Sequence, residues 1–211
     1  MKYILFDLDN TLYSAEREVL SLMDRRINDY MHEVVGIPLD QVDTLRRDYW
    51  QRYGVTMGGL MRHHQVDPED YLRYVHDIDI VSRIAPDPEL RAALLTLRQR
   101  RAVFTNSSVC HSERVLAALG LRDLFEEIYD IRFTGYRPKP YPGPYRAVLD
   151  HLGAAAEECI MVEDSPENLQ TAKTLGMGTV LVGNRPAADY VDVHIDQVSR
   201  IPEAVAFWET A

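Results

Sequence analysis

Residues 2–11 read KYILFDLDNT, an apolar run that leads directly into two carboxylates two positions apart. Residues 2–6 fit a strand that is buried on both faces, as strands of parallel sheets are. Asp7 and Asp9 then fall at or just past the carboxyl end of that strand, where open α/β sheets bind their ligands. Two carboxylates so close repel each other unless a cation lies between them, and Mg²⁺ suits such oxygen ligands. Since Asp is also common in turns after strands, the later segments of the chain must decide between the two interpretations.

From about residue 83 onward, apolar residues alternate between helical spacing and short continuous runs. The spacing predicts helices around 90–97, 115–119, 145–152 and 166–175, and strands at 102–104, 159–162 and 179–182. Strands that alternate with helices form a parallel sheet wrapped by helices. We therefore expect an α/β protein with a Rossmann-like core.

Residues 15–80 break this alternation. Apolar residues recur at three and four positions from Val19 to Val34, which predicts one long amphipathic helix. Further helices are expected after it, separated by breaks at 36–38, at Gly58-Gly59 and at 67–68.

These patterns predict two domains. Residues 1–14 and 82–211 are expected to form the Rossmann-like core, and residues 15–81 an inserted all-helical cap that sets substrate specificity. Because the insertion leaves the core just after Asp9, it is expected to lie over the two carboxylates.

Polar side chains also follow the later strands. Thr105 and Asn106 come directly after the strand at 102–104 and precede a helix, where side-chain donors and free N–H groups suit a phosphate. A plain helix cap from Ser107 or Ser108 is the alternative. Lys139 lies between two prolines before the next helix, and we expect it to neutralise phosphate beside the carboxylates.

A second acidic pair, Glu163 and Asp164, follows the strand at 159–162. A helix cap is again the alternative, because Pro166 suits the first position of a helix. Two strand ends that each carry carboxylates are nevertheless what a Mg²⁺ site requires. Together the four segments predict a metal-assisted phosphate site.

In this order the segments resemble the motifs of the haloacid dehalogenase superfamily of phosphohydrolases, whose first motif reads D-x-D-x-T. The resemblance covers the whole predicted core. It implies that Asp7 is the nucleophile and that Asp9 is the general acid and base. It also implies that Thr105, Asn106 and Lys139 bind the phosphate.

The same resemblance implies a Mg²⁺ ion. Its ligands would be the Asp7 carboxylate, the backbone carbonyl of Asp9 and Asp164, with Glu163 bound directly or through water. Asn168 departs from the pattern, since many relatives have a further Asp at this position.

The expected chemistry agrees with these roles. A carboxylate that attacks phosphorus forms an aspartyl-phosphate and divides one difficult displacement into two. Mg²⁺ and Lys139 would stabilise charge on the transferring oxygens. Asp9 would protonate the leaving oxygen and later activate water. Because a dehalogenase does not need that acid, Asp9 argues against the dehalogenase branch.

Residues 58–68, with Tyr71 and residues 75–79, resemble the cap of the pyrimidine 5′-nucleotidase branch. His63 and His64 are expected to contact substrate there, with a helix-end or core role as the alternative for at least one of them. The predicted enzyme is a Mg²⁺-dependent phosphomonoesterase that hydrolyses nucleoside 5′-monophosphates, pyrimidines preferred. The alternatives are a small sugar-phosphate or phosphoglycolate phosphatase, a phosphoglucomutase, and a non-enzymatic module that binds a phosphometabolite.

The composition argues against other classes of protein. A formal net charge of −10 opposes nucleic-acid binding, which needs concentrated Lys and Arg. Residues 98–101 form a basic cluster that we interpret as a solvated helix end. No apolar stretch approaches the ~20 residues that span a bilayer. Since Asp7 and Asp9 interrupt the N-terminal apolar run, a secretory signal is not expected either.

The two cysteines, Cys110 and Cys159, are isolated in the sequence. They lack the spacing of a zinc site or a disulfide framework. We therefore expect a cytoplasmic protein whose partner is a small phosphorylated metabolite. The oligomeric state and the preferred base are left open.

Overall fold

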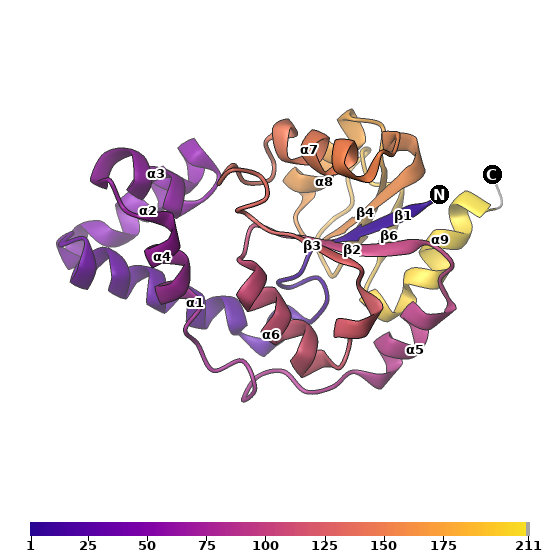
Figure 1. Ribbon diagram of the computed structural model, residues 1–211, viewed down its shortest axis with the longest axis horizontal. Coiled ribbons are helices and arrows are strands. Elements are labelled where there is room, and N and C mark those ends of the chain that lie inside the picture. The colour runs from indigo at the N-terminus through magenta and orange to yellow at the C-terminus, as the bar shows by residue number, and fades with distance from the viewer. Residues whose placement is uncertain (210–211) are drawn as a thin grey trace.

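The computed structural model describes residues 1–209 and is built around a six-stranded parallel sheet (Figure 1). The strands lie in the order β3-β2-β1-β4-β5-β6. Their bounds are Tyr3–Phe6 for β1, Arg100–Phe104 for β2, Glu127–Tyr129 for β3, Cys159–Glu163 for β4, Gly178–Val182 for β5 and Val193–Ile195 for β6.

Strand β1 occupies the middle of the sheet because it is apolar on both faces. Ile4 and Phe6 are buried in one hydrophobic cluster and Leu5 in the cluster on the opposite face. Phe6 pairs with Val103 of β2 and with Val162 of β4. The carboxyl ends of these strands are therefore level, which brings the polar residues that follow them to one edge of the sheet.

Helices cover both faces of the sheet (Figure 1). Helices α5 (Pro88–Thr96), α6 (Val109–Leu119) and α9 (Ile201–Glu209) pack on one face, and α7 (Pro142–Leu152) and α8 (Pro166–Thr174) pack on the other. Short 3₁₀ turns lie at Ala15–Arg17, Arg122–Leu124, Ala156–Glu158 and Val198–Arg200. The predicted Rossmann-like α/β architecture is confirmed.

Four further helices lie between β1 and α5, to one side of the sheet (Figure 1, left). They are α1 (Val19–Asp29), α2 (Leu39–Tyr53), α3 (Thr56–His64) and α4 (Pro68–Val75). The buried apolar side chains of α2, α3 and α4 form a hydrophobic cluster of their own, joined by Ile131 from the loop after β3, whereas Val19 and Met23 of α1 pack into the cluster of the sheet core. Within residues 1–209, every helix is too short or too polar to cross a membrane.

The prediction of one helix from Val19 to Val34 needs a correction. The α-helix ends at Asp29, and the chain continues as a wider π-helical turn over Tyr30–Val34, in which the N–H of Val35 reaches the carbonyl of Tyr30 at 3.0 Å. Tyr30 and Met31 are both buried in this turn.

The predicted break at Gly58-Gly59 is wrong, because both glycines lie inside α3. A Cβ atom on Gly59 would fall 2.1 Å from the ring of Tyr49. Helices α2 and α3 therefore cross so closely that only glycine fits at the contact. Here glycine allows close packing and does not end the helix.

A forked ion pair joins α4 to the sheet core. The guanidinium of Arg132, in the loop after β3, donates to both carboxylate oxygens of Glu69 on α4 at 2.7 and 2.8 Å. The hydroxyl of Tyr136 donates to the same carboxylate at 2.7 Å. Hydrogen bonds from Arg132 and Tyr136 lower the pKa of Glu69 to about 2. This fork of parallel hydrogen bonds fixes the orientation of α4 relative to the core.

Candidate active site

The carboxyl edge of the sheet brings a lysine into contact with two of the predicted site carboxylates. Lys139 lies in the loop before α7 and is 1% exposed. Its Nζ atom donates to Asp7 Oδ1 at 2.8 Å, to Glu163 Oε1 at 2.7 Å and to the carbonyl of Phe104 at 2.7 Å. Since the three bonds use all the protons of the ammonium group, the position of Lys139 is fully determined.

The acidic residues of the two strand ends form one cluster. Oxygen atoms of Asp7, Glu163 and Asp164 all lie within 4.8 Å of one another. Burial, together with the charge of Glu163, raises the pKa of Asp7 in spite of Lys139. Burial and the charge of Asp7 raise the pKa of Asp164 to about 6. Three carboxylates around one lysine carry more negative charge, when all are ionised, than Lys139 can neutralise.

This donor set suits a divalent cation. Three carboxylates supply only hard oxygen ligands, which Mg²⁺ prefers, and the cation would supply the missing positive charge. Thr11 connects two parts of this carboxylate cluster. Its hydroxyl lies 3.2 Å from Asp7 Oδ2 and accepts the N–H of Asp164 at 3.1 Å, which ties the ends of β1 and β4 together.

The predicted phosphate-binding residues after β2 lie beside Lys139. Asn106 accepts the N–H of Lys139 at 2.8 Å and donates to its carbonyl at 3.1 Å. Asn106 therefore positions the lysine loop in addition to any contact with phosphate. The hydroxyl of Thr105 is buried and accepts the N–H of Ser107 at 3.0 Å. Ser108, the residue just before α6, caps that helix by accepting the N–H of His111.

The carboxylate of Asp9 bonds to a different set of side chains from those of the acidic cluster. Its Oδ1 accepts from Tyr13 at 2.5 Å and from His111 at 2.8 Å, and its Oδ2 accepts from Ser107 at 2.6 Å. Burial alone would raise the pKa of Asp9, but His111 and the hydrogen bonds from Ser107 and Tyr13 outweigh it and hold this pKa below its usual range. Asp9 is thus held in its ionised form.

Sequence reasoning missed the residues that hold Asp9. Tyr13 and His111 were assigned no role, although His111 lies in the first turn of the helix that follows Thr105. The sequence did offer one signal for His111: it stands at the start of a helix that begins at the carboxyl edge of the sheet, where Asp9 also lies. Its contact with Asp9, 102 residues away, follows from the pairing of β1 with β2.

Asn168, which stands where the expected motif has an Asp, bonds to one of the site carboxylates. Its Nδ2 atom donates to Glu163 Oε1 at 2.5 Å. The second oxygen of Glu163 accepts the N–H of Ser165 at 3.0 Å. An ionised Asp at 168 has no proton to donate. Asn168 and Lys139 together hold the Glu163 carboxylate in one orientation.

The two histidines predicted to contact substrate lie on the last turn of α3. His63 is hydrogen bonded to the hydroxyl of Tyr53 at 2.7 Å, and His64 to that of Tyr49 at 2.9 Å. Both histidines are exposed, and their hydrogen-bond partners are tyrosines of α2. The structure therefore does not bring them into contact with the core site residues.

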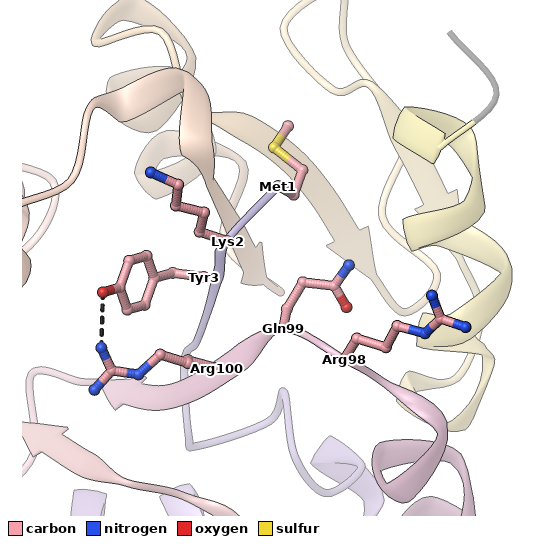
Figure 2. A pocket seen from close by; sticks show the side chains of 6 residues that line it. All are labelled: Met1, Lys2, Tyr3, Arg98, Gln99 and Arg100. Atoms are coloured by element: carbon pink, nitrogen blue, oxygen red, sulfur yellow. Dashed lines mark hydrogen bonds between the residues drawn. The ribbon is translucent and has the colours of Figure 1, made fainter.

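The basic cluster of the sequence lies at the opposite edge of the sheet. Lys2, Tyr3 and Arg100 line a hollow of about 330 Å³ there (Figure 2). Lys2 pairs with Glu158 at 2.6 Å, and Arg100 pairs with Glu126 at 2.6 Å and donates to Tyr3 at 2.8 Å. The interpretation as a helix end is corrected, because α5 ends at Thr96 and Arg100 begins β2. Two of the cations that line this hollow are therefore already paired with carboxylates of the chain.

Comparison with known proteins agrees with this geometry. The family model described as haloacid dehalogenase-like hydrolase matches residues 1–176. The chain is 29% identical over 199 residues to "Phosphate metabolism protein 8" of Saccharomyces cerevisiae, which covers 85% of this chain and 61% of that protein. The chain thus spans less than two thirds of that relative.

Two more similarities extend the comparison. The chain is 28% identical to a "Phosphoglycolate phosphatase" of Rhodospirillum rubrum, over 86% of this chain and 79% of that one. The crystal structure of "HAD phosphatase from Thermococcus onnurineus" superposes with a TM-score of 0.65 at 20% identity, covering 97% of this chain and 98% of the other. At that identity the superposition shows a shared fold.

Proposed function

Because this chain belongs to the haloacid dehalogenase-like hydrolase family, we propose that it is a Mg²⁺-dependent phosphomonoesterase that forms a phosphoryl intermediate on Asp7. The observation that carries the proposal is the contact of Asp7 with the buried Lys139 inside a cluster of three carboxylates. A carboxylate held at the edge of a cation site can attack a phosphate that the same cations hold.

In the first half of the proposed reaction, a carboxylate oxygen of Asp7 bonds to phosphorus as the bond from phosphorus to the leaving oxygen breaks. Asp9, whose resting form is ionised, must first take up a proton, which it then passes to the leaving oxygen so that an alcohol departs. In the second half, Asp9 accepts a proton from water as the water oxygen bonds to phosphorus. The bond between phosphorus and Asp7 breaks, which releases inorganic phosphate, frees the Asp7 carboxylate and leaves Asp9 protonated for the next turnover.

Each cation has a defined place in this scheme. Lys139 orients the attacking oxygen of Asp7 and neutralises part of the charge on the transferring group. Asp7 and Asp164, with Glu163 close by and the Asp9 carbonyl as the further predicted ligand, would hold Mg²⁺, which would supply Lewis-acid stabilisation of the phosphoryl oxygens.

We assign residues 1–14 and 82–211 to the catalytic core and residues 15–81 to a cap that selects the leaving group. For the substrate we propose nucleoside 5′-monophosphates with pyrimidines preferred, on the basis of the sequence of the cap. His63 and His64 are proposed to contact the base or ribose after they exchange their tyrosine partners for substrate.

A second substrate class has its own support. The Rhodospirillum rubrum relative is named a phosphoglycolate phosphatase, and its similarity extends over most of this chain. A small sugar phosphate or phosphoglycolate is therefore the alternative substrate. Either substrate leaves the chemistry at Asp7 unchanged, since both are phosphate monoesters.

The experiment that tests the proposal measures phosphate release by the purified protein with Mg²⁺. The substrates are UMP, CMP, AMP, GMP, phosphoglycolate and glucose 6-phosphate, each at several concentrations. The highest kcat/KM for UMP or CMP supports the nucleotidase. The highest value for phosphoglycolate or the sugar phosphate rejects it and keeps the phosphatase. Transfer of the phosphoryl group to sugar in place of water would identify a mutase, and no turnover of any ester would leave a binding module.

A further inference from the structure

One of the three side chains that bond to Asp9 is a buried histidine, His111, to which the proposed reaction gives no role. His111 is fully buried, 0% exposed, in the first turn of α6. Its Nε2 atom lies 2.8 Å from Asp9 Oδ1. Since an ionised carboxylate only accepts, the hydrogen of this bond belongs to Nε2.

The other ring nitrogen of His111 has no hydrogen-bond partner within residues 1–209, although it is buried. A buried polar atom without a partner costs free energy, and an apolar side chain of similar size would avoid that cost. The bond from Nε2 to Asp9 is the contact that explains why a histidine occupies this buried position although its Nδ1 atom has no partner.

The ring of His111 is also fixed in position. It stacks on the ring of His76, at a centroid distance of 4.7 Å and an interplanar angle of 24°. The backbone N–H of His111 bonds to Ser108, whose hydroxyl also contacts His76 Nδ1 at 3.0 Å. Because its backbone N–H is bonded and one face of its ring is stacked, the imidazole is not free to follow Asp9 if the carboxylate turns.

Tyr13 and Ser107 differ from His111 in one respect. Their hydroxyl groups rotate and can follow the carboxylate to a new position, whereas the N–H of a stacked ring has one direction. Of the three donors to Asp9, His111 is thus the one that sets the plane in which the carboxylate lies.

We propose that His111 is a positioning residue, which holds Asp9 through Nε2–H in the orientation from which Asp9 transfers protons to the leaving oxygen and from water. This inference rests on the proposed role of Asp9. The side-chain hydrogen bond of His111 is to Asp9 and not to the attacking Asp7. Its removal should leave the site assembled and impair proton transfer.

The test uses His111→Gln and His111→Met in the full chain. The two side chains have nearly the same length and shape, but only Gln keeps an N–H at the place of Nε2. His111→Asn is a third variant, polar but too short to reach Asp9. The substrates are phenyl, p-nitrophenyl and dinitrophenyl phosphate, whose leaving groups need protonation in decreasing order. kcat/KM is used because it reports the step in which the leaving group departs.

We expect His111→Met to lower kcat/KM for phenyl phosphate by roughly 10-fold or more and for dinitrophenyl phosphate by at most about 3-fold, since an acid–base group contributes most where the leaving group is basic. His111→Asn should behave like His111→Met, and His111→Gln should recover most of the loss. The ratio of the two kcat/KM values does not depend on the fraction of folded enzyme, so partial misfolding cannot produce this pattern.

Asp9→Asn separates this inference from the proposed function. If Asp9→Asn shows no leaving-group dependence, Asp9 is not the acid and the proposed function fails. If Asp9→Asn shows the dependence but His111→Met lowers all three substrates by one factor, His111 has a structural role only and this inference is overturned. In the double variant, His111→Met should cause no further loss of kcat/KM beyond that of Asp9→Asn.

Discussion

Lys139 and Asp7 meet at 2.8 Å although 132 residues separate them in the chain. The lysine is buried together with Asp7 and Glu163, and the three groups depend on one another for charge compensation.

Replacing Asp7 by Asn should reduce phosphate release to background. The substitution keeps the shape of the side chain and removes the attacking charge. Circular dichroism and the unfolding midpoint should stay close to those of the unaltered protein. Near-normal turnover of Asp7→Asn would refute the assignment of the nucleophile.

Replacing Lys139 by Met should destabilise the protein in the absence of metal. The change leaves two buried carboxylates without their cation, which typically costs about 3–5 kcal/mol in the free energy of unfolding. Urea unfolding in a chelator at neutral pH measures the effect. Lys2→Met is the control, since Lys2 forms a comparably short ion pair at the surface, 2.6 Å from Glu158, and its loss should barely move the midpoint. Equal effects of the two variants would contradict the account of Lys139.

Mg²⁺ should stabilise the protein more at neutral pH than under mildly acidic conditions. In the metal-free protein the pKa of Asp164 rises from 3.8 to about 6, and burial also raises that of Asp7. A carboxyl whose pKa is higher in the folded state binds more protons there, so stability falls as pH rises through this window. Mg²⁺ replaces those protons. The unfolding temperature measured with chelator and with Mg²⁺ across this range checks the sign, and Asp164→Asn should shrink the shift.

Chelation should also abolish phosphate release, and added Mg²⁺ should restore it. Full activity in excess chelator would show that the carboxylate cluster does not serve a metal in turnover.

His76 should make the protein sensitive to acid. Burial, with the nearby His111 adding to it, lowers the pKa of His76 from 6.5 to about 3. The unfolded chain then binds a proton that the folded chain does not, so stability is lost as pH falls below 6.5. Between neutral pH and pH ~4, the free energy of unfolding of the unaltered protein should fall by roughly 3 kcal/mol more than that of the His76→Asn variant. Urea midpoints at the two pH values measure this difference, and parallel profiles would contradict it.

His64→Ala should alter the ranking of nucleotide substrates more than the hydrolysis of p-nitrophenyl phosphate. A site that pairs polar groups of the substrate discriminates against analogues that lack them. Tyr49→Phe is the control, because it removes the partner of His64 and leaves the imidazole. If both substitutions leave the ratio of kcat/KM for UMP to kcat/KM for AMP unchanged, His64 does not select the base.

The core could be predicted because its signals are local. The runs at 102–104, 159–162 and 179–182 correspond to β2, β4 and β5, and their apolar residues are buried on both faces as expected. Strands β3 and β6 were missed. Each has only three residues, too few for an apolar run to differ from a loop.

The side-chain contacts of the site could not be predicted from spacing. Asn106 bonds to the backbone of Lys139, and His111 bonds to Asp9, because strand register and loop geometry bring together segments that are far apart in sequence. Gly59 shows the same limit, since only the ring of Tyr49 on the neighbouring helix explains why glycine lies inside α3. Residue type indicated which groups are reactive, but the structure shows which groups restrain them.

Strand β1 gains its neighbours late in synthesis, because Tyr3 pairs with Arg100 on one side and Cys159 on the other. Pairing over such separations costs loop-closure entropy before contacts are gained, so sheets of this kind fold slowly. Until then an apolar strand has two open edges, a pattern that favours aggregation with other chains. Charges that flank an apolar run oppose such aggregation. Asp7 and Asp9, with Lys2 at the other end, thus protect the nascent strand before any substrate can bind.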